Sequence, residues 1–281
     1  AAIALAIAVS GSVEAFVAGM NREAERLGMT STGFVEPSGY DAGNVTTAWD
    51  FARFCLFYIR EHPEAMEELH SLPAFTYPKG ENIPPGGRSA LGPITQPNHN
   101  NLVGRLDGVD GLKTGYIDES GYNIAVTAER NGRRLLAVLM GGEGETTGEG
   151  NLQRAIDATA LLSYGFFRFA TFVPEPPPAE PVRIYGGRAR TTIPVAAEIP
   201  AVTVSLETLP GLRWERYPEY PLKAPLSAGT VLGELVLVRA DGNRIATVPL
   251  LAESDIPRGG WLKRFRDWLI LGFRSVFNKG Q

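Results

Sequence analysis

The chain has 281 residues, 44% of them hydrophobic, which is enough for one large core or two moderate ones. Lysine and arginine total 27 against 31 aspartate and glutamate residues, so the net charge is −4 and no basic excess indicates a nucleic-acid partner. The single cysteine, Cys55, lies in an apolar stretch without a second thiol, and we interpret it as a packing residue.

The chain begins with apolar residues that lack the positive flank and initiator methionine of a signal peptide. Apolar residues at helical spacing continue beyond this start, through residues 13–27. We predict helices over residues 1–9, 13–27 and 47–60, and we expect the first to be a buried core helix. No run reaches the ~20 apolar residues that a membrane-spanning helix needs.

Residues 72–101 are rich in proline, glycine and asparagine, and we predict extended surface loops there. Three strands are predicted next, over residues 109–115, 122–128 and 134–140. The pair Asn131-Gly132 between the last two strands is a strong hairpin signal. Apolar residues at helical spacing then predict a helix over residues 152–166.

The order of these elements favours an α+β fold and a division of the chain into four parts. Residues 1–171 form a domain of helices and antiparallel sheet. Residues 172–181 are too rich in proline for either element and are predicted to be a linker. Residues 182–258 contain short β-like runs and are predicted to form a small β-sandwich. Residues 259–281 form an amphipathic helix.

The last helix, over residues 261–279, has tryptophans on its apolar face and is basic on the other. This pattern is typical of helices that lie in a membrane interface. A terminal helix docked on its own domain is the alternative. We favour the membrane surface because two large aromatic residues, Trp261 and Trp268, have little domain left to cover.

One short motif indicates a site that could bind a substrate. Lys113-Thr114-Gly115 ends an apolar strand and precedes Tyr116 and a hairpin. Lys113 offers a positive charge and Thr114 a hydroxyl to a substrate carboxylate, while Gly115 lets a peptide backbone approach closely. The motif alone is weak, so its context decides its interpretation.

That context resembles one family along nearly the whole chain. The matching runs, in order and spacing, are Met29–Phe34, Thr46–Asp50, Val109–Gly115, Ser120–Asn123, Leu139–Gly142, Leu162–Phe166 and Pro221–Pro225. They are similar to the serine-type D-alanyl-D-alanine carboxypeptidases of peptidase family S11, which are low-molecular-mass penicillin-binding proteins. The resemblance implies a β-lactamase/transpeptidase-like first domain.

The resemblance also implies an enzymatic activity and a cellular location. A member of this family trims the terminal D-alanine of peptidoglycan pentapeptides and is acylated by penicillins or other β-lactams. It needs no cofactor. It lies peripherally on the periplasmic face of the cytoplasmic membrane. Lys113, Thr114, Gly115 and Tyr116 are then expected to bind substrate. His99 is a further candidate, because a polar residue of that loop can approach the substrate carboxylate; capping of the loop is the alternative.

The sequence departs from the family in two motifs. No serine here has a lysine three residues on, and none begins Ser-x-Asn. The alanine-rich start resembles the helix that follows Ser-x-Asn, so we expect the nucleophile to come from residues upstream of Ala1 or from a companion N-terminal fragment, and the chain alone to be inactive. The alternative is a catalytically inactive scaffold or binding protein at the membrane surface.

Overall fold

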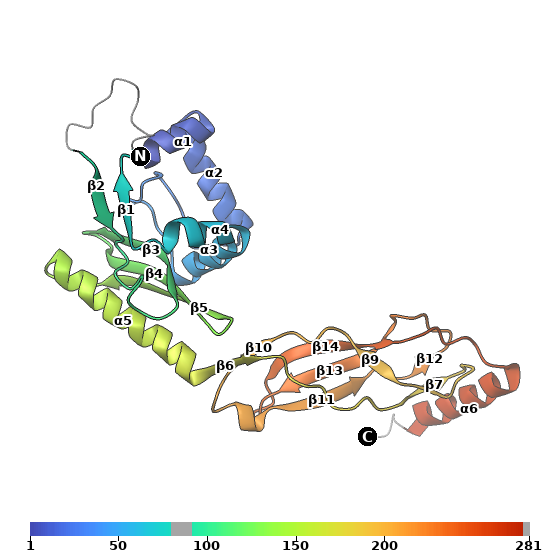
Figure 1. The fold of residues 1–281 in the computed structure, drawn as a ribbon. Coiled ribbons are helices and arrows are strands. Elements are labelled where there is room, and N and C mark those ends of the chain that lie inside the picture. Colours follow the sequence, from blue (N-terminus) through green and yellow to red (C-terminus); the bar gives the residue numbers. More distant parts are fainter. Residues whose placement is uncertain (80–91, 278–281) are drawn as a thin grey trace. The chain divides into compact units, whose positions relative to one another are not determined.

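The computed structural model describes residues 1–79 and 92–277 (Figure 1). The chain forms two compact units, Ala1–Phe167 and Arg168–Gln281. Each unit has its own core, and we describe them one after the other.

The first unit begins with helices whose ends follow from local sequence. They are α1 (Ala2–Ser10), α2 (Val13–Arg26), α3 (Ala48–Glu61), α4 (Pro63–Ala65) and the π-helix η1 (Met66–His70). The Ser12 hydroxyl caps α2 by accepting from the Ala15 amide at 3.1 Å, and the Thr47 hydroxyl caps α3 by accepting from the Asp50 amide at 3.1 Å. The three helices predicted from the sequence are confirmed to within a residue or so.

The prediction that the first helix is buried is wrong in the structure described here. Ala6 is buried, but Leu5 and Val9 are 65% and 72% exposed, because no described element covers that side of α1. No single described helix is long and apolar enough to cross a membrane. The pair α1 and α2 meets those criteria jointly, but the two helices are bent by 86° at their break.

A three-stranded antiparallel sheet forms the centre of the unit. Its strands, in the order β3-β4-β5, are β3 (Val109–Ile117), β4 (Gly121–Arg130) and β5 (Arg133–Gly142). The predicted hairpin turn is confirmed: Asn131 and Gly132 have φ values of 52° and 73°, which a type I′ turn requires. Because β3 is at the edge, one of its sides has no strand partner among the described residues.

The prediction of loops over residues 72–101 is partly wrong. β1 (Ala74–Tyr77) and β2 (Ile94–Pro97) pair as an antiparallel ribbon. Every residue of both strands is exposed, so neither strand has the buried apolar face whose period-two pattern indicates a strand in a sequence. The predicted loop at residues 80–91 lies outside the described residues.

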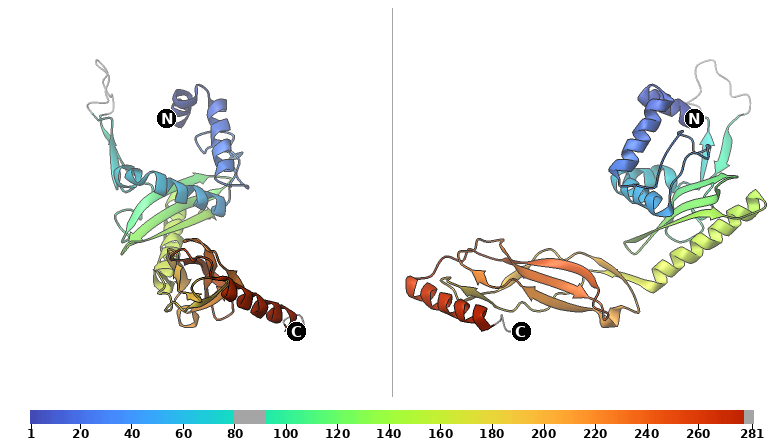
Figure 2. Two further views of the ribbon diagram at one scale, coloured as in Figure 1. Left: turned by 90° about the vertical axis from the view of Figure 1, so that its right-hand side faces the viewer. Right: turned by 180° about the vertical axis from the view of Figure 1, so that it is seen from behind.

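The sheet lies between two layers of helix (Figure 1), and the views in Figure 2 agree. α5 (Thr147–Arg168) crosses one face, and α3 contacts β5 on the other. The main core joins β4, β5 and α5 through small and branched side chains such as Val126, Ala158 and Leu162. The neighbouring Gly150 allows α5 to approach Tyr122 of β4 closely.

The second unit is predominantly β-structure. Its strands are β6 (Phe169–Phe172), β7 (Val182–Tyr185), β8 (Thr191–Thr192), β9 (Pro194–Ala196), β10 (Val202–Ser205), β11 (Arg213–Pro218), β12 (Leu222–Lys223), β13 (Val231–Val238) and β14 (Arg244–Ala252), with a 3₁₀ turn η3 (Leu209–Gly211). They form sheets in the orders β11-β13-β14-β9, β12-β7-β8 and β10-β6. The helix α6 (Trp261–Phe277) closes the unit.

The start of this unit differs from the predicted division. Residues 169–171, which the prediction placed in the first domain, belong to β6, and β6 pairs with β10 of the second unit. The proline-rich segment that follows is held against β11, where the Trp214 indole donates to the Glu175 carbonyl at 2.8 Å and Arg216 forms an ion pair with Glu180 at 2.6 Å. The segment is therefore part of the second unit.

Replacing Gly150 by alanine tests the close packing of α5. The new Cβ would lie 2.1 Å from a ring carbon of Tyr122, and that ring is buried and cannot move away freely. We expect a loss of about 1–3 kcal/mol in the free energy of unfolding, measured by denaturant titration. Gly148→Ala is the control, because its Cβ would meet nothing closer than 4.0 Å. Equal stability of the two variants would contradict this packing.

Candidate substrate-binding groove

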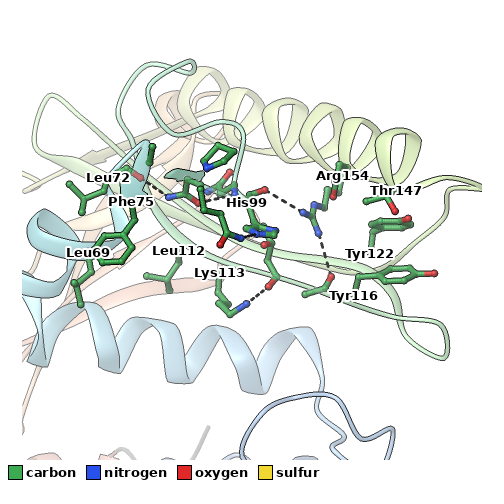
Figure 3. Close-up of a pocket in the computed structure, with 18 of the residues that line it drawn as sticks. Leu69, Leu72, Phe75, His99, Leu112, Lys113, Tyr116, Tyr122, Thr147 and Arg154 are labelled. Carbon is green, nitrogen blue, oxygen red and sulfur yellow. Dashed lines mark hydrogen bonds between the residues drawn. The ribbon is translucent and has the colours of Figure 1, made fainter. Parts of the chain in front are cut away.

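A groove of about 890 Å³ runs along β3 in the first unit. Residues of η1, of the loop before β3, of β3 itself and of the start of α5 line it (Figure 3). They include the five candidates from the sequence, which are Lys113, Thr114, Gly115, Tyr116 and His99. The structure therefore brings all the predicted site residues to one groove.

Lys113 lies on the edge strand with its side chain accessible to solvent. Its ammonium group donates to the carbonyl of Thr114. Desolvation by the surrounding protein lowers the pKa of Lys113, and the positive charge of Arg154 lowers it further. The amine therefore loses its charge at a lower pH than a free lysine does.

Gly115 and Tyr116 leave space beside the strand. A Cβ added at Gly115 would meet no protein atom closer than 4.0 Å, so the backbone here is open to a ligand. The Tyr116 ring packs against Tyr122 with centroids 4.3 Å apart and the ring planes tilted by 33°. The Tyr116 hydroxyl donates to Asp118 at 2.7 Å, which raises the pKa of Tyr116. The aromatic pair thus forms one end of the groove.

Arg154 of α5 is a site residue that we did not predict. Its side chain is buried and its guanidinium donates to the carbonyls of Gly115 at 3.4 Å, Asn123 at 3.3 Å and His99 at 3.4 Å. The sequence did contain a signal. Arg154 falls on the inward face of α5, in register with Ala158 and Leu162, where a charged residue is unusual.

The sequence left two roles open for His99 in the loop before β3: approaching the substrate carboxylate or capping the loop. Asn98 and Asn100 cap the loop: the Asn98 amide donates to the carbonyl of Leu72 at 2.9 Å, and the Asn100 amide to that of Gly111 at 2.8 Å. The His99 side chain instead lines the groove, where the Gln96 amide nitrogen donates to its Nε2 at 2.6 Å.

His70 of η1 holds β3 through both of its ring nitrogens. Its Nδ1 donates to the Leu112 carbonyl at 3.0 Å, and its Nε2 accepts from the Tyr58 hydroxyl at 3.0 Å. A carbonyl can only accept, so this geometry assigns the proton to Nδ1. The histidine therefore positions the residue immediately before Lys113.

Cys55 takes no part in the groove. It is fully buried, and desolvation raises the pKa of its thiol to about 12. At neutral pH the group is a neutral, inert packing residue, as the sequence predicted.

Comparison with known proteins identifies a related group. Residues 1–144 match the family model for peptidase S11, D-alanyl-D-alanine carboxypeptidase. D-alanyl-D-alanine carboxypeptidase DacC of Escherichia coli K12 is 32% identical over 99% of this chain, and DacA of Haemophilus influenzae is 31% identical over 99%. The chain spans 65% and 67% of the lengths of these two relatives.

Solved structures give the same picture of the fold. Penicillin binding protein 5 from Haemophilus influenzae superposes with a TM-score of 0.69 at 29% identity, over 91% of this chain and 70% of that one. The carboxypeptidase DacD from Francisella tularensis has a TM-score of 0.70 at 23% identity, over 92% and 72%. The α+β, transpeptidase-like fold expected from the sequence is confirmed.

The coupling between Arg154 and Lys113 can be measured directly. Arg154→Gln removes a nearby positive charge, so we expect the pKa of Lys113 to rise toward its usual range. Titration of the labelled lysine by NMR gives the value. Arg154→Lys keeps the charge, and Arg105→Gln removes one from an exposed site, so both should leave the pKa lowered. An unchanged Lys113 pKa in Arg154→Gln would refute the coupling.

Proposed function

Because the chain belongs to peptidase family S11, the D-alanyl-D-alanine carboxypeptidases, we propose that it forms the carboxylate-binding part of such an enzyme. The substrate is the D-alanyl-D-alanine end of a peptidoglycan pentapeptide, and β-lactams occupy the same groove. Lys113 and Thr114 on the open edge of β3 are the observation that carries this proposal.

The arrangement suits a peptide that ends in a carboxylate. Lys113 and Arg154 line the groove with positive charge, as does Lys79, while Glu68 is the one acid among the described lining residues. The Thr114 hydroxyl also lines the groove and can donate to a carboxylate. An extended peptide can approach the edge of β3 at Gly115, where no side chain fills the space, while the Gly115 carbonyl stays bonded to Arg154. Tyr116 and His99 then flank the bound end of the peptide.

The nucleophile of this chemistry is a serine activated by a neighbouring lysine. None of the 281 residues forms Ser-x-x-Lys or Ser-x-Asn. We propose that the serine and its lysine are supplied from outside these residues, by an upstream segment or a companion fragment. The serine hydroxyl, activated by that lysine, would then attack the substrate carbonyl beside Lys113.

A fluorescent penicillin tests the role of Lys113 in the protein encoded by the complete reading frame. Lys113→Ala should label roughly 10–100-fold more slowly, because a charge-assisted hydrogen bond to the carboxylate is lost. Lys113→Arg keeps the charge and should retain part of the rate. Circular dichroism should be unchanged in both, since the side chain is accessible. Equal labelling of parent and Lys113→Ala would contradict the assigned role.

The same experiment separates the enzyme from its rival, a catalytically inactive scaffold. A folded complete protein that takes up no penicillin would be evidence for the scaffold. Rapid labelling that depends on Lys113 would be evidence for the enzyme.

We further propose that α6 attaches the protein to a membrane surface, the periplasmic face of the cytoplasmic membrane. Trp261 and Trp268 are 73% and 67% exposed, and Phe265 is exposed between them. Lys263 and Arg264 add positive charge to the same helix. A helix that exposes large aromatics beside basic residues is suited to an interfacial position.

Vesicle sedimentation tests this attachment. Deleting residues 261–281 should abolish binding to anionic vesicles. The double variant Trp261→Ser, Trp268→Ser should weaken binding by at least about tenfold, because aromatic area inserted at the interface is lost. Both tryptophans are exposed, so the double variant should remain folded, which the deletion alone does not guarantee. Unchanged sedimentation of both variants would refute the anchor.

A further inference from the structure

A recess of about 540 Å³ lies between α6 and the β-structure of the second unit. It is lined by residues of β7, of β12, of the segment before α6 and of the first turns of α6. Figure 1 shows α6 beside β7 and β12 at this end of the unit. None of the residues that line the recess lines the groove of the first unit.

Three cations line the recess, and each comes from a different segment. Lys223 is on β12, Arg258 lies in the segment that bridges to Gly187, and Arg264 is on α6. All three side chains are exposed. In the part of the chain that the structure describes, none of them makes an ion pair. Their charges are therefore available to a ligand.

The backbone holds these three segments together. Lys223 is in register with Tyr185 in the parallel pairing of β12 with β7. The amide of Gly259 donates to the carbonyl of Gly186 at 2.9 Å, which places Arg258 against the turn after β7. The positions of Lys223 and Arg258 are thus set by main-chain bonds and do not depend on α6.

The position of α6 is set by two side chains that reach back to the same turn. The buried carboxylate of Asp267 accepts from the Gly186 amide at 2.9 Å. The ammonium of Lys263 donates to the carbonyls of Gly187, Arg188 and Ala189 at 2.5, 3.1 and 3.0 Å. Asp267 is the one acid among the described residues that line the recess. Its carboxylate is already engaged, so three positive charges face one negative charge there.

The apolar side chains of α6 extend from the cations into solvent. Trp261, Phe265 and Trp268 line the recess and are also among the most exposed large apolar residues of the unit. The Phe265 and Trp268 rings stack with centroids 6.0 Å apart. A ligand held by the cations would therefore have an apolar surface immediately beside its anionic group.

We propose that this recess binds the phosphodiester headgroup of an anionic phospholipid, with Lys223, Arg258 and Arg264 around the phosphate and the aromatic residues of α6 against the adjoining chains. The proposal rests on the membrane attachment proposed above and adds a defined headgroup site to it. Its distinctive element is the contribution of Lys223 and Arg258, which lie outside the amphipathic helix. Such a site would fix the β-unit to the surface at two points, the helix and the recess.

The combination of charge and apolar area selects a lipid over other anions. A free phosphate would use the cations and leave the exposed tryptophans without a role. An acidic peptide would satisfy the cations but would not require aromatic residues at the depth of a membrane interface. Basic side chains next to interfacial aromatics match the two-part chemistry of a lipid, in which a charged headgroup adjoins apolar chains.

The test compares binding of the 281-residue chain to vesicles of phosphatidylcholine alone and with added phosphatidylglycerol. The site variant carries Lys223→Gln, Arg258→Gln and Arg264→Gln. The control carries Arg213→Gln, Arg239→Gln and Arg244→Gln, which remove the same charge from exposed surface ion pairs of the same unit. Thermal unfolding checks that both variants remain folded.

We expect the parent to prefer the anionic vesicles and the site variant to lose affinity for them by roughly a hundredfold, with a change of a few fold at most in the control. Lys223→Glu alone should also weaken the binding, although it leaves α6 untouched. If the site variant and the control lose affinity equally, the attraction is general and the headgroup site is refuted. A free anion is tested with inorganic phosphate at millimolar concentration. The lipid assignment is refuted if phosphate shifts the Lys223 and Arg258 NMR signals and displaces the vesicles, and if the Trp261→Ser, Trp268→Ser variant binds the vesicles as the parent does.

These outcomes are distinguishable from a failure of the attachment itself. If the parent chain binds neither kind of vesicle, both the membrane proposal and the headgroup site fall. If the tryptophan variant loses binding while the site variant keeps it, the membrane attachment stands and the headgroup site is refuted.

Discussion

The position of β3 determines the groove, and β3 is an edge strand whose backbone is held by side chains from elsewhere. Asn100 donates to the carbonyl of Gly111, His70 to that of Leu112, and Arg154 to that of Gly115. Buried backbone carbonyls must find donors, and a neighbouring strand would normally supply them at a sheet interior. Here side-chain donors fix the strand, while the Lys113 residue stays exposed and the space beside Gly115 stays open. An edge that is both rigid and open is what recognition by main-chain pairing requires.

Much of this could be predicted because the signals are local. The hairpin at Asn131-Gly132 follows from the backbone angles that these two residues allow, and α5 follows from apolar spacing within one segment. The motif at Lys113 gained meaning from the strand around it. The contacts that hold this strand could not be predicted, because they join residues far apart: His70 precedes Leu112 by 42 positions, and Arg154 follows Gly115 by 39.

In the second unit the individual strands are positioned by contacts that a pattern of apolar residues does not show. β11 is rich in charged residues and contains no aliphatic residue, and it is held by pairing with β13 and by ion pairs such as Arg216 with Glu180. Neither is visible in a pattern of apolar residues. β6 was assigned to the wrong side of the domain boundary because its pairing partner, β10, comes about thirty residues later. Short strands carry little sequence information of their own, so their partners determine where they belong.

The sequence predicted the apolar face of α6 but not the means by which the helix is held. A terminal helix of a globular unit normally docks by burying its apolar face, which contributes roughly 25 cal/mol per Å². α6 is held instead by Asp267 and Lys263, whose partners are the amide and carbonyls of one turn, and its tryptophans remain exposed. Polar docking therefore fixes the direction of the helix without covering its aromatic side. The two interpretations of the C-terminal helix, docked on its own unit or facing a membrane, are therefore compatible. Asp267 and Lys263 dock the helix, and the exposed tryptophans are left to face a membrane.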